Sequence, residues 1–328
     1  MTKSEPRKVG KKIEIKFGDK VSKKRSFFGR YWLQGEFYFN NDKRVATVTD
    51  VKFISSDLLV IAHREAAKLF LVKLSESDYE IISEKTIRIK WLPSRNRFFH
   101  PDLFAVKDNL IYMTDYSNRC AVFELVGDKF IFNNELKVGW HRYHGCYLEN
   151  DSLLLGSVSD GIIQIIDTKT HCTSQIQFDS QSAPINERNV RIKTIGKQED
   201  YLILGLDKRK GKSDRPNNGG DSWVALFEQN DHHLKCVSVI KFENSQLDGH
   251  ATNMGYHFFT TYDGHRKKGV IKIFKVENAE LKVTHSVVCK SFPHGIDILD
   301  GKIAYTSYKE SSVIVYDLDY VFQTDELD

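Results

Sequence analysis

Hydrophobic and polar residues alternate with a period of two along much of this 328-residue chain, in short runs rich in Val, Ile, Phe and Tyr. The segments "DSLLLGSV" at 151–158 and "SSVIVYDL" at 311–318 contain continuous apolar runs, and "QIQF" at 175–178 alternates. Polar turns such as "END" at 149–151 and "LDG" at 299–301 separate the runs. Alternation of this kind, with Asn, Asp and Gly at the turns, is typical of antiparallel strands joined by hairpins. The pattern predicts an all-β protein with almost no helix.

The same succession of strands and turns recurs along the chain at intervals of about 40–50 residues, which is typical of propellers. The segments begin near Asp50, at His100, at His144, near Asn189, at His250 and at His294. The last segment has only three strands, and "GEFYFNNDKRVATV" at 35–48 offers the missing one. A closed ring leaves no long sheet edge exposed. We therefore predict a six-bladed β-propeller of four-stranded antiparallel blades, with the last blade closed by an N-terminal strand.

Positive charge gathers at the N-terminus. The formal net charge of the chain is +4, but residues 1–25 alone contain ten Lys or Arg and three acidic residues. We expect a basic N-terminal arm over residues 1–26 and a single propeller domain over residues 27–328. Such an arm is either a solvated tail or a binding segment for an anionic partner.

Three further features narrow the class of protein. No apolar run approaches the roughly 18–20 residues of a membrane span, and the N-terminus lacks the apolar segment of a secretory signal. The five cysteines have no CxxC spacing, which argues against a disulfide framework or a structural zinc knuckle. We expect a cytoplasmic protein with no membrane span.

Histidine stands at or near the start of four of the repeated segments. In a propeller the first strand of each blade lines the central channel, so residues at its start lie near one mouth. The predicted ring at this mouth contains Asp50, His100, His144, Asn189 or Arg191, His250 and His294. Converging neutral imidazoles are the usual ligands of zinc and similar metals. We predict a divalent transition metal, zinc first, with four ligands: His100, His144, His250 and His294. The alternative is that each histidine only bonds the backbone of the neighbouring blade.

The segments beside these histidines carry cationic and aromatic side chains. Arg97, Trp140, Arg142 and Arg191 are the predicted substrate-binding residues, because such side chains suit a ligand with an anionic group and a flat or sugar-like face. Asp50 and Tyr143 are the candidates for moving protons. His294 is a candidate general base in a mechanism without metal, since the unperturbed pKa of histidine is about 6.5.

The strand starts "PHGI" at 293–296 and "YHG" at 143–145 resemble those of one propeller superfamily. It comprises NHL-repeat proteins, gluconolactonase-like hydrolases and peptidyl-amidoglycolate lyases, all with six blades, and the resemblance covers most of the chain at the level of the fold. The lyase branch places histidines around a central zinc, and the resemblance implies the same for this ring. The acidic and Asn ligands of the gluconolactonase-like calcium site have no match here.

Two classes of function follow from these features. The first is an enzyme with a histidine-lined channel, a metal-assisted lyase or hydrolase that acts on a small polar or anionic substrate. The second is a non-catalytic propeller scaffold that binds a protein or polyanionic partner. The fold alone does not decide between them.

Overall fold

The computed structural model of the chain describes thirteen segments of the sequence. They are residues 11–17, 48–64, 66–87, 101–115, 119–139, 141–158, 161–178, 190–208, 220–230, 233–263, 268–289, 292–307 and 310–327. Almost every regular element in them is a β-strand, so the all-β prediction is confirmed.

The strands follow one another as antiparallel meanders. The first half of the chain forms β2 (Val48–Ser55), β3 (Leu58–His63), β4 (Lys68–Leu74), β5 (Tyr79–Thr86), β6 (Phe104–Lys107), β7 (Leu110–Thr114), β8 (Arg119–Val126), β9 (Lys129–Lys137), β10 (Tyr143–Glu149), β11 (Ser152–Ser157), β12 (Ile162–Asp167) and β13 (Thr173–Phe178). The second half forms β14 (Val190–Gln198), β15 (Tyr201–Lys208), β16 (Ser222–Asn230), β17 (His233–Phe242), β18 (Ser245–Asn253), β19 (Tyr256–Asp263), β20 (Lys268–Glu277), β21 (Glu280–Cys289), β22 (Pro293–Leu299), β23 (Lys302–Ser307) and β24 (Ser312–Asp317).

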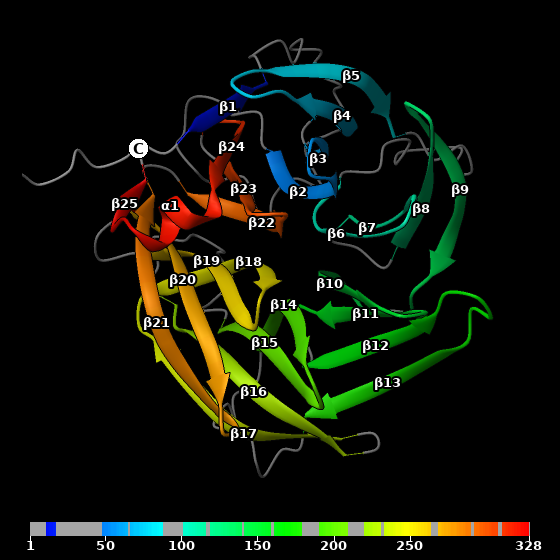
Figure 1. Cartoon of the computed structure of the whole chain (residues 1–328). Helices are drawn as coiled ribbons and strands as arrows, with labels where there is room; N and C mark the ends of the chain where they lie inside the picture. The colour runs from blue at the N-terminus through cyan, green and yellow to red at the C-terminus, as the bar shows by residue number, and fades with distance from the viewer. Residues whose placement is uncertain are drawn as a thin grey trace, which may run out of the picture.

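The sheets stand around a common centre, which is the arrangement of a β-propeller (Figure 1). The first strand of each meander lies nearest the centre: β2, β6, β10, β14, β18 and β22 (Figure 1). Burial falls from the centre outward. Five of the six residues of β3 are buried, whereas β5 at the outer edge has none. The predicted turns are also present, because Asn150 and Asp300 adopt the positive φ of 50° and 47° that tight hairpins require.

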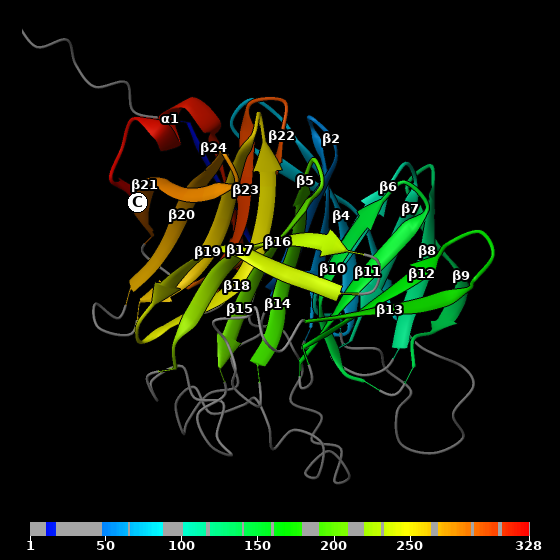
Figure 2. The same ribbon diagram turned by 90° about the horizontal axis from the view of Figure 1, so that it is seen from below.

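Two pairs of neighbouring sheets are joined at their outer edges. β13 pairs in parallel with β17, which makes one eight-stranded sheet. The short helix α1 (Leu318–Phe322) leads to β25 (Glu326–Leu327), and β25 pairs in parallel with β21. Figure 2 shows the ring from its side, with α1 on one face. The C-terminal segment thus links the last meander to the one before it.

An N-terminal strand completes the last sheet, but it is not the one expected. β1 (Lys12–Lys16) pairs antiparallel with β24, in the sheet order β1-β24-β23-β22. The prediction had located this strand at 35–48 and had assigned residues 12–16 to the basic arm. Ile15 is fully buried between the last sheet and the first, whereas Lys12 and Lys16 are exposed. The alternating pattern "KIEIK" is therefore an edge strand with one buried face, and residues 35–47 lie outside the described segments.

Candidate functional site

Five of the innermost strands contain an irregularity close to their start. The register with the next strand shifts at Thr49 in β2, His144 in β10, Lys193 in β14, Asp248–Gly249 in β18 and His294–Gly295 in β22. A β-bulge bends the strand and redirects the side chain at that point. In β10, β14, β18 and β22 the redirected residue is a histidine, a lysine or an aspartate, so the bulges gather ionisable groups at one level of the channel.

Glycine after the bulged residue allows adjacent inner strands to approach. A Cβ atom at Gly249 would collide with the carbonyl oxygen of His294. Thr260 on the second strand of that sheet links the same two strands: it accepts the Gly249 N–H at 2.6 Å and donates to the His294 carbonyl at 2.5 Å. The "HG" pattern of the sequence therefore records close strand packing as well as the position of a histidine.

Backbone carbonyls fix both bulged histidines. His144 Nδ1 lies 2.9 Å from the carbonyl oxygen of Lys193, and His294 Nδ1 lies 2.7 Å from that of Thr49. A carbonyl only accepts, so in both rings Nδ1 carries a proton, and in the neutral form of such a ring Nε2 has the lone pair. The two rings are 5.6 Å apart between centroids. Histidines that bind metals usually donate their other ring N–H to a carbonyl or carboxylate in this way, which orients the ring.

Two carboxylates and a lysine surround these lone pairs. Asp102 Oδ2 lies 3.5 Å from His144 Nε2, and Asp248 Oδ1 lies 3.8 Å from His144 Nε2 and 3.7 Å from His294 Nε2. Lys193 Nζ lies 2.9 Å from His144 Nε2 and 2.7 Å from Asp248 Oδ1. We call Asp102, His144, Lys193, Asp248 and His294 the channel cluster.

The channel cluster is removed from solvent. Its members are between 0% and 5% exposed. Burial, helped by the charge of Lys193, holds the pKa of His144 well below its usual value. For Asp248 burial acts to raise the pKa, but the attraction of the nearby positive charge, that of Lys193 first, outweighs it and the pKa is lowered. His144 is thus neutral and Asp248 ionised at neutral pH.

Three of these residues fit a metal site. Asp102, His144 and His294 each offer one ligand atom, a carboxylate oxygen or a ring nitrogen, and these three atoms lie within 4.8 Å of one another. Zinc–ligand bonds of about 2.0–2.2 Å imply that two ligands of one tetrahedral ion lie roughly 3.3–3.5 Å apart, close to the 3.5 Å between Asp102 Oδ2 and His144 Nε2. Within the described segments, Asp102 Oδ2 and Asp248 Oδ2 are buried without a hydrogen-bond partner. Two imidazoles and a carboxylate form a ligand set that divalent first-row metals accept.

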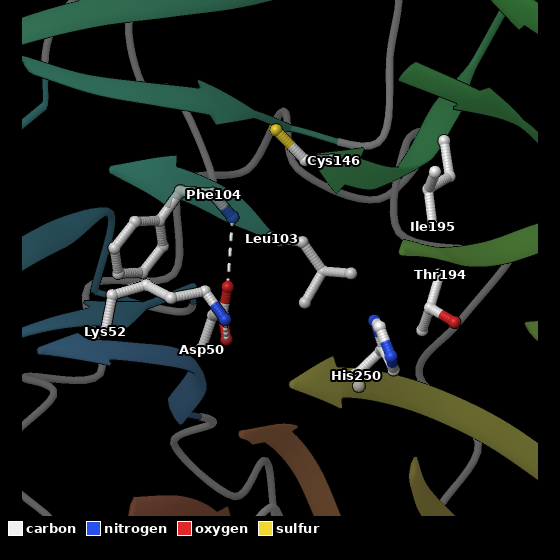
Figure 3. A pocket seen from close by; sticks show the side chains of 9 residues that line it. Asp50, Lys52, Leu103, Phe104, Cys146, Thr194, Ile195 and His250 are labelled. Carbon is white, nitrogen blue, oxygen red and sulfur yellow. Dashed lines mark hydrogen bonds and ion pairs between the residues drawn. The ribbon is translucent and has the colours of Figure 1, made fainter. Parts of the chain in front are cut away.

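A small pocket adjoins the cluster. Asp50, Lys52, Leu103, Phe104, Cys146, Thr194, Ile195, Gly249 and His250 line it. Figure 3 shows Asp50 and Lys52 on one side and His250 with Thr194 on the other. Its volume of about 20 Å³ is room for little more than a water molecule. Asp50 accepts the Val51 N–H at 2.9 Å and the Phe104 N–H at 3.0 Å, yet burial raises its pKa to about 6.

His250 belongs to this pocket and not to the metal-ligand group. Its Nε2 lies 3.2 Å from His257 Nδ1, and His257 Nε2 lies 2.7 Å from Gln198 Oε1. Burial lowers the pKa of His250 well below the ordinary value and that of His257 to about 4. Of the four predicted metal ligands, the structure brings His144 and His294 together and places His250 in the pocket, because the bulge of β18 lies at Asp248–Gly249. His100 lies outside the described segments.

The other predicted residues are dispersed. Asp50 lies in the pocket, one residue beyond the bulged Thr49. Tyr143 is fully buried in a hydrophobic cluster between two sheets. Arg191 makes a double ion pair with Asp207, at 2.6 and 2.7 Å, and Arg142 is exposed. Arg97 and Trp140 lie outside the described residues.

Sequence reasoning missed Asp102, Lys193 and Asp248. Asp248 had a detectable signal, since "DG" at 248–249 repeats the "HG" of 144–145 and 294–295 with another residue before the glycine. Aligning the segments on glycine would have found it. Lys193 is followed by Thr194, and Asp102 precedes β6 by two residues, so neither residue stands before a glycine at a strand start.

No helix in the described part of the chain has the length and hydrophobicity of a membrane span.

No family model and no curated protein matches the sequence. Among solved structures, U3-55K matches with a TM-score of 0.55 at 8% identity, over 84% of this chain and 97% of that one. The β-propeller domain of Cps50 (Swd1) from Myceliophteria thermophila matches with a TM-score of 0.50 at 12% identity, over 82% and 83% of the two chains. Raptor from Chaetomium thermophilum gives 0.50 at 12% identity, over 85% of this chain and 24% of that one. At these identities the likeness concerns the fold alone, and the chain has a β-propeller fold.

Proposed function

We propose that this protein is a six-bladed β-propeller enzyme, closed by β1, whose channel cluster holds a divalent transition metal. The ligands are Asp102, His144 and His294, with Asp248 beside them, and zinc is the first candidate. The reaction is a metal-assisted hydrolysis or elimination on a small polar or anionic substrate. One observation carries the proposal: two buried imidazoles, each held at Nδ1 by a backbone carbonyl, direct Nε2 toward buried carboxylate oxygens.

The residues of the cluster have separable tasks in this proposal. A bound metal of this class polarises a carbonyl group or lowers the pKa of bound water. Arg64 holds Asp102 Oδ1 at 3.5 Å, which leaves Oδ2 directed at His144. The carbonyls of Lys193 and Thr49 keep both imidazoles in one tautomer and prevent their rotation. Arg142 is the predicted anion-binding residue that stays exposed, whereas Asp207 neutralises Arg191.

Metal titration tests the proposal. Purified protein is stripped with a chelator, titrated with zinc, and its bound metal measured by mass spectrometry. We expect one zinc per chain, and a loss of affinity of more than about tenfold in His144→Ala and in His294→Ala, because each removes one ligand. His250→Ala is the matched control, a channel histidine outside the ligand group, and should bind like the wild type. A wild-type protein that binds no zinc, cobalt or manganese would refute the proposal.

A second candidate function is a non-catalytic scaffold. The complete burial of the channel cluster favours it, because a buried ion network also stabilises the centre of a ring without any ligand. Exposed apolar side chains on the β8–β9 hairpin, Val126, Ile131 and Phe132, are 49%, 48% and 43% exposed and offer contacts for a protein partner. In this case the basic residues of the 1–26 arm would add affinity for an anionic partner in the cytoplasm, with exposed Lys12 and Lys16 on the edge strand β1.

A further inference from the structure

Lys193 holds a central position in the channel cluster. Its ammonium group lies 2.9 Å from His144 Nε2 and 2.7 Å from Asp248 Oδ1, and the residue is 4% exposed. Its carbonyl oxygen accepts from Nδ1 of the same histidine at 2.9 Å. One residue thus contacts both nitrogen atoms of the His144 ring. The backbone contact orients the ring, and the side chain occupies the lone pair that a metal would use.

The lone pair of His144 Nε2 can serve only one partner at a time. An ammonium hydrogen at 2.9 Å and a metal ion about 2.0–2.1 Å away would lie on the same side of the ring nitrogen. Asp248 Oδ1 has a similar conflict, because it is within 2.7 Å of Lys193 and within 3.8 Å of both imidazoles. Two positive groups of this kind do not share one buried position without strong repulsion.

The net charge of the channel cluster also argues against a metal ion and the Lys193 ammonium being bound there together. Asp102 and Asp248 supply two negative charges, which Lys193 and the neighbouring Arg64 balance. A divalent ion added to this balanced set would leave two excess positive charges in a buried place, which is costly. If the Lys193 ammonium leaves this contact, the excess positive charge is smaller. His144 Nε2 and Asp248 Oδ1 then become accessible to the metal ion.

We propose that Lys193 is the resident cation of this site, and that a divalent metal binds by displacing its ammonium from His144 and Asp248. The inference rests on the proposed metal site and adds its regulation. The site exchanges one cation for another, so that the metal-free protein keeps its buried carboxylates paired. A further consequence is that wild-type affinity for the metal is lower than the ligand set alone would give.

Replacing Lys193 with an uncharged side chain tests the exchange. We expect zinc affinity in Lys193→Met to rise by roughly tenfold or more, because one positive charge next to the ligands is gone. Lys52→Met is the matched control, since Lys52 is the lysine of the adjoining pocket and donates to the Ile296 carbonyl at 2.8 Å. That variant should bind zinc like the wild type. Zinc should also raise the melting temperature of Lys193→Met far more than that of either other protein.

The outcomes separate the inference from the function on which it rests. Equal zinc affinity in the wild type and in Lys193→Met overturns the exchange but leaves the metal site standing. No zinc binding by either protein overturns both. If Lys193→Met does not fold without metal, Lys193→Gln replaces it, because its amide still donates to Asp248, and the same comparison of affinities applies.

Discussion

The channel contains two neighbouring groups of Asp, Lys and His, and they differ in how their polar atoms are satisfied. In the pocket, both oxygens of Asp50 accept backbone N–H groups, and Lys52 donates to a backbone carbonyl. In the channel cluster, Asp102 Oδ2 and Asp248 Oδ2 have no hydrogen-bond partner among the described residues. Unsatisfied buried polar atoms are costly and call for a ligand or another explanation. Residue types alone therefore do not distinguish the two groups, whereas the hydrogen bonds of their carboxylates do.

The largest expected effect concerns the two buried lysines. In chelator-treated protein, Lys193→Met should lower the free energy of unfolding by about 3–5 kcal/mol, because it leaves Asp248 buried and ionised without its partner. Lys52→Met should cost less, since the raised pKa of Asp50, about 6, lets this carboxyl take up a proton, and backbone donors remain. Urea denaturation measures both. Equal losses would show that the two groups are energetically alike.

The acid sensitivity of the histidine pair gives the next effect. Burial lowers the pKa of His257 from 6.5 to about 4, so between these values the unfolded chain binds a proton that the folded chain does not. Stability is therefore lost as the pH falls from about 6.5 to 4, by about 3 kcal/mol. His257→Gln should remove this part of the loss. Unfolding free energies at pH 7 and pH 4.5 measure it, and an unchanged difference would contradict the prediction.

Asp50 should give the free energy of unfolding a pH dependence opposite to that of His257. Its pKa is raised from 3.8 to about 6, so between these values the folded chain holds a proton that the unfolded chain has lost. Its contribution to stability is full below about pH 4 and is lost as the pH rises through 6, by about 3 kcal/mol. Asp50→Asn should therefore make the protein relatively less stable at low pH than the wild type. The same measurements apply, and a variant with the opposite slope would show that Asp50 is ionised throughout.

The smallest effect concerns the glycines that follow the bulged residues. Gly249→Ala should cost about 1–3 kcal/mol, because the new methyl group meets the His294 carbonyl and must push the strands apart. Gly145→Ala is the matched control, since its nearest neighbour would be an Ile195 side-chain carbon at 3.3 Å, which can yield. Thermal unfolding compares the two. The Gly249 variant should also weaken zinc binding, because His294 shifts with its strand.

The fold could be predicted further than the site. Period-two alternation and Asn, Asp and Gly turns identified the meanders, because a hairpin strand needs one residue in two on each face and a tight turn needs positive φ. The described strand that pairs with β24 is Lys12–Lys16, whereas the closing strand is predicted at 35–48, of which residues 35–47 lie outside the described segments. Both segments alternate in polarity, and only the pairing with β24 distinguishes them.

From the sequence by itself, His144 and His294 are predicted to lie in one ring with His100 and His250, since each stands at or near the start of a repeated segment, and the structure brings these two together. Only the tertiary structure decided their companions. Asp102 lies two residues before β6, Lys193 lies in β14 and Asp248 lies in β18, and bulges in β14 and β18 direct the last two inward. The prediction placed Arg191 and His250 in the ring, whereas the bulges of β14 and β18 lie at Lys193 and at Asp248–Gly249, two residues away in each strand. Register is set by pairing between strands, and that information is absent from any single segment.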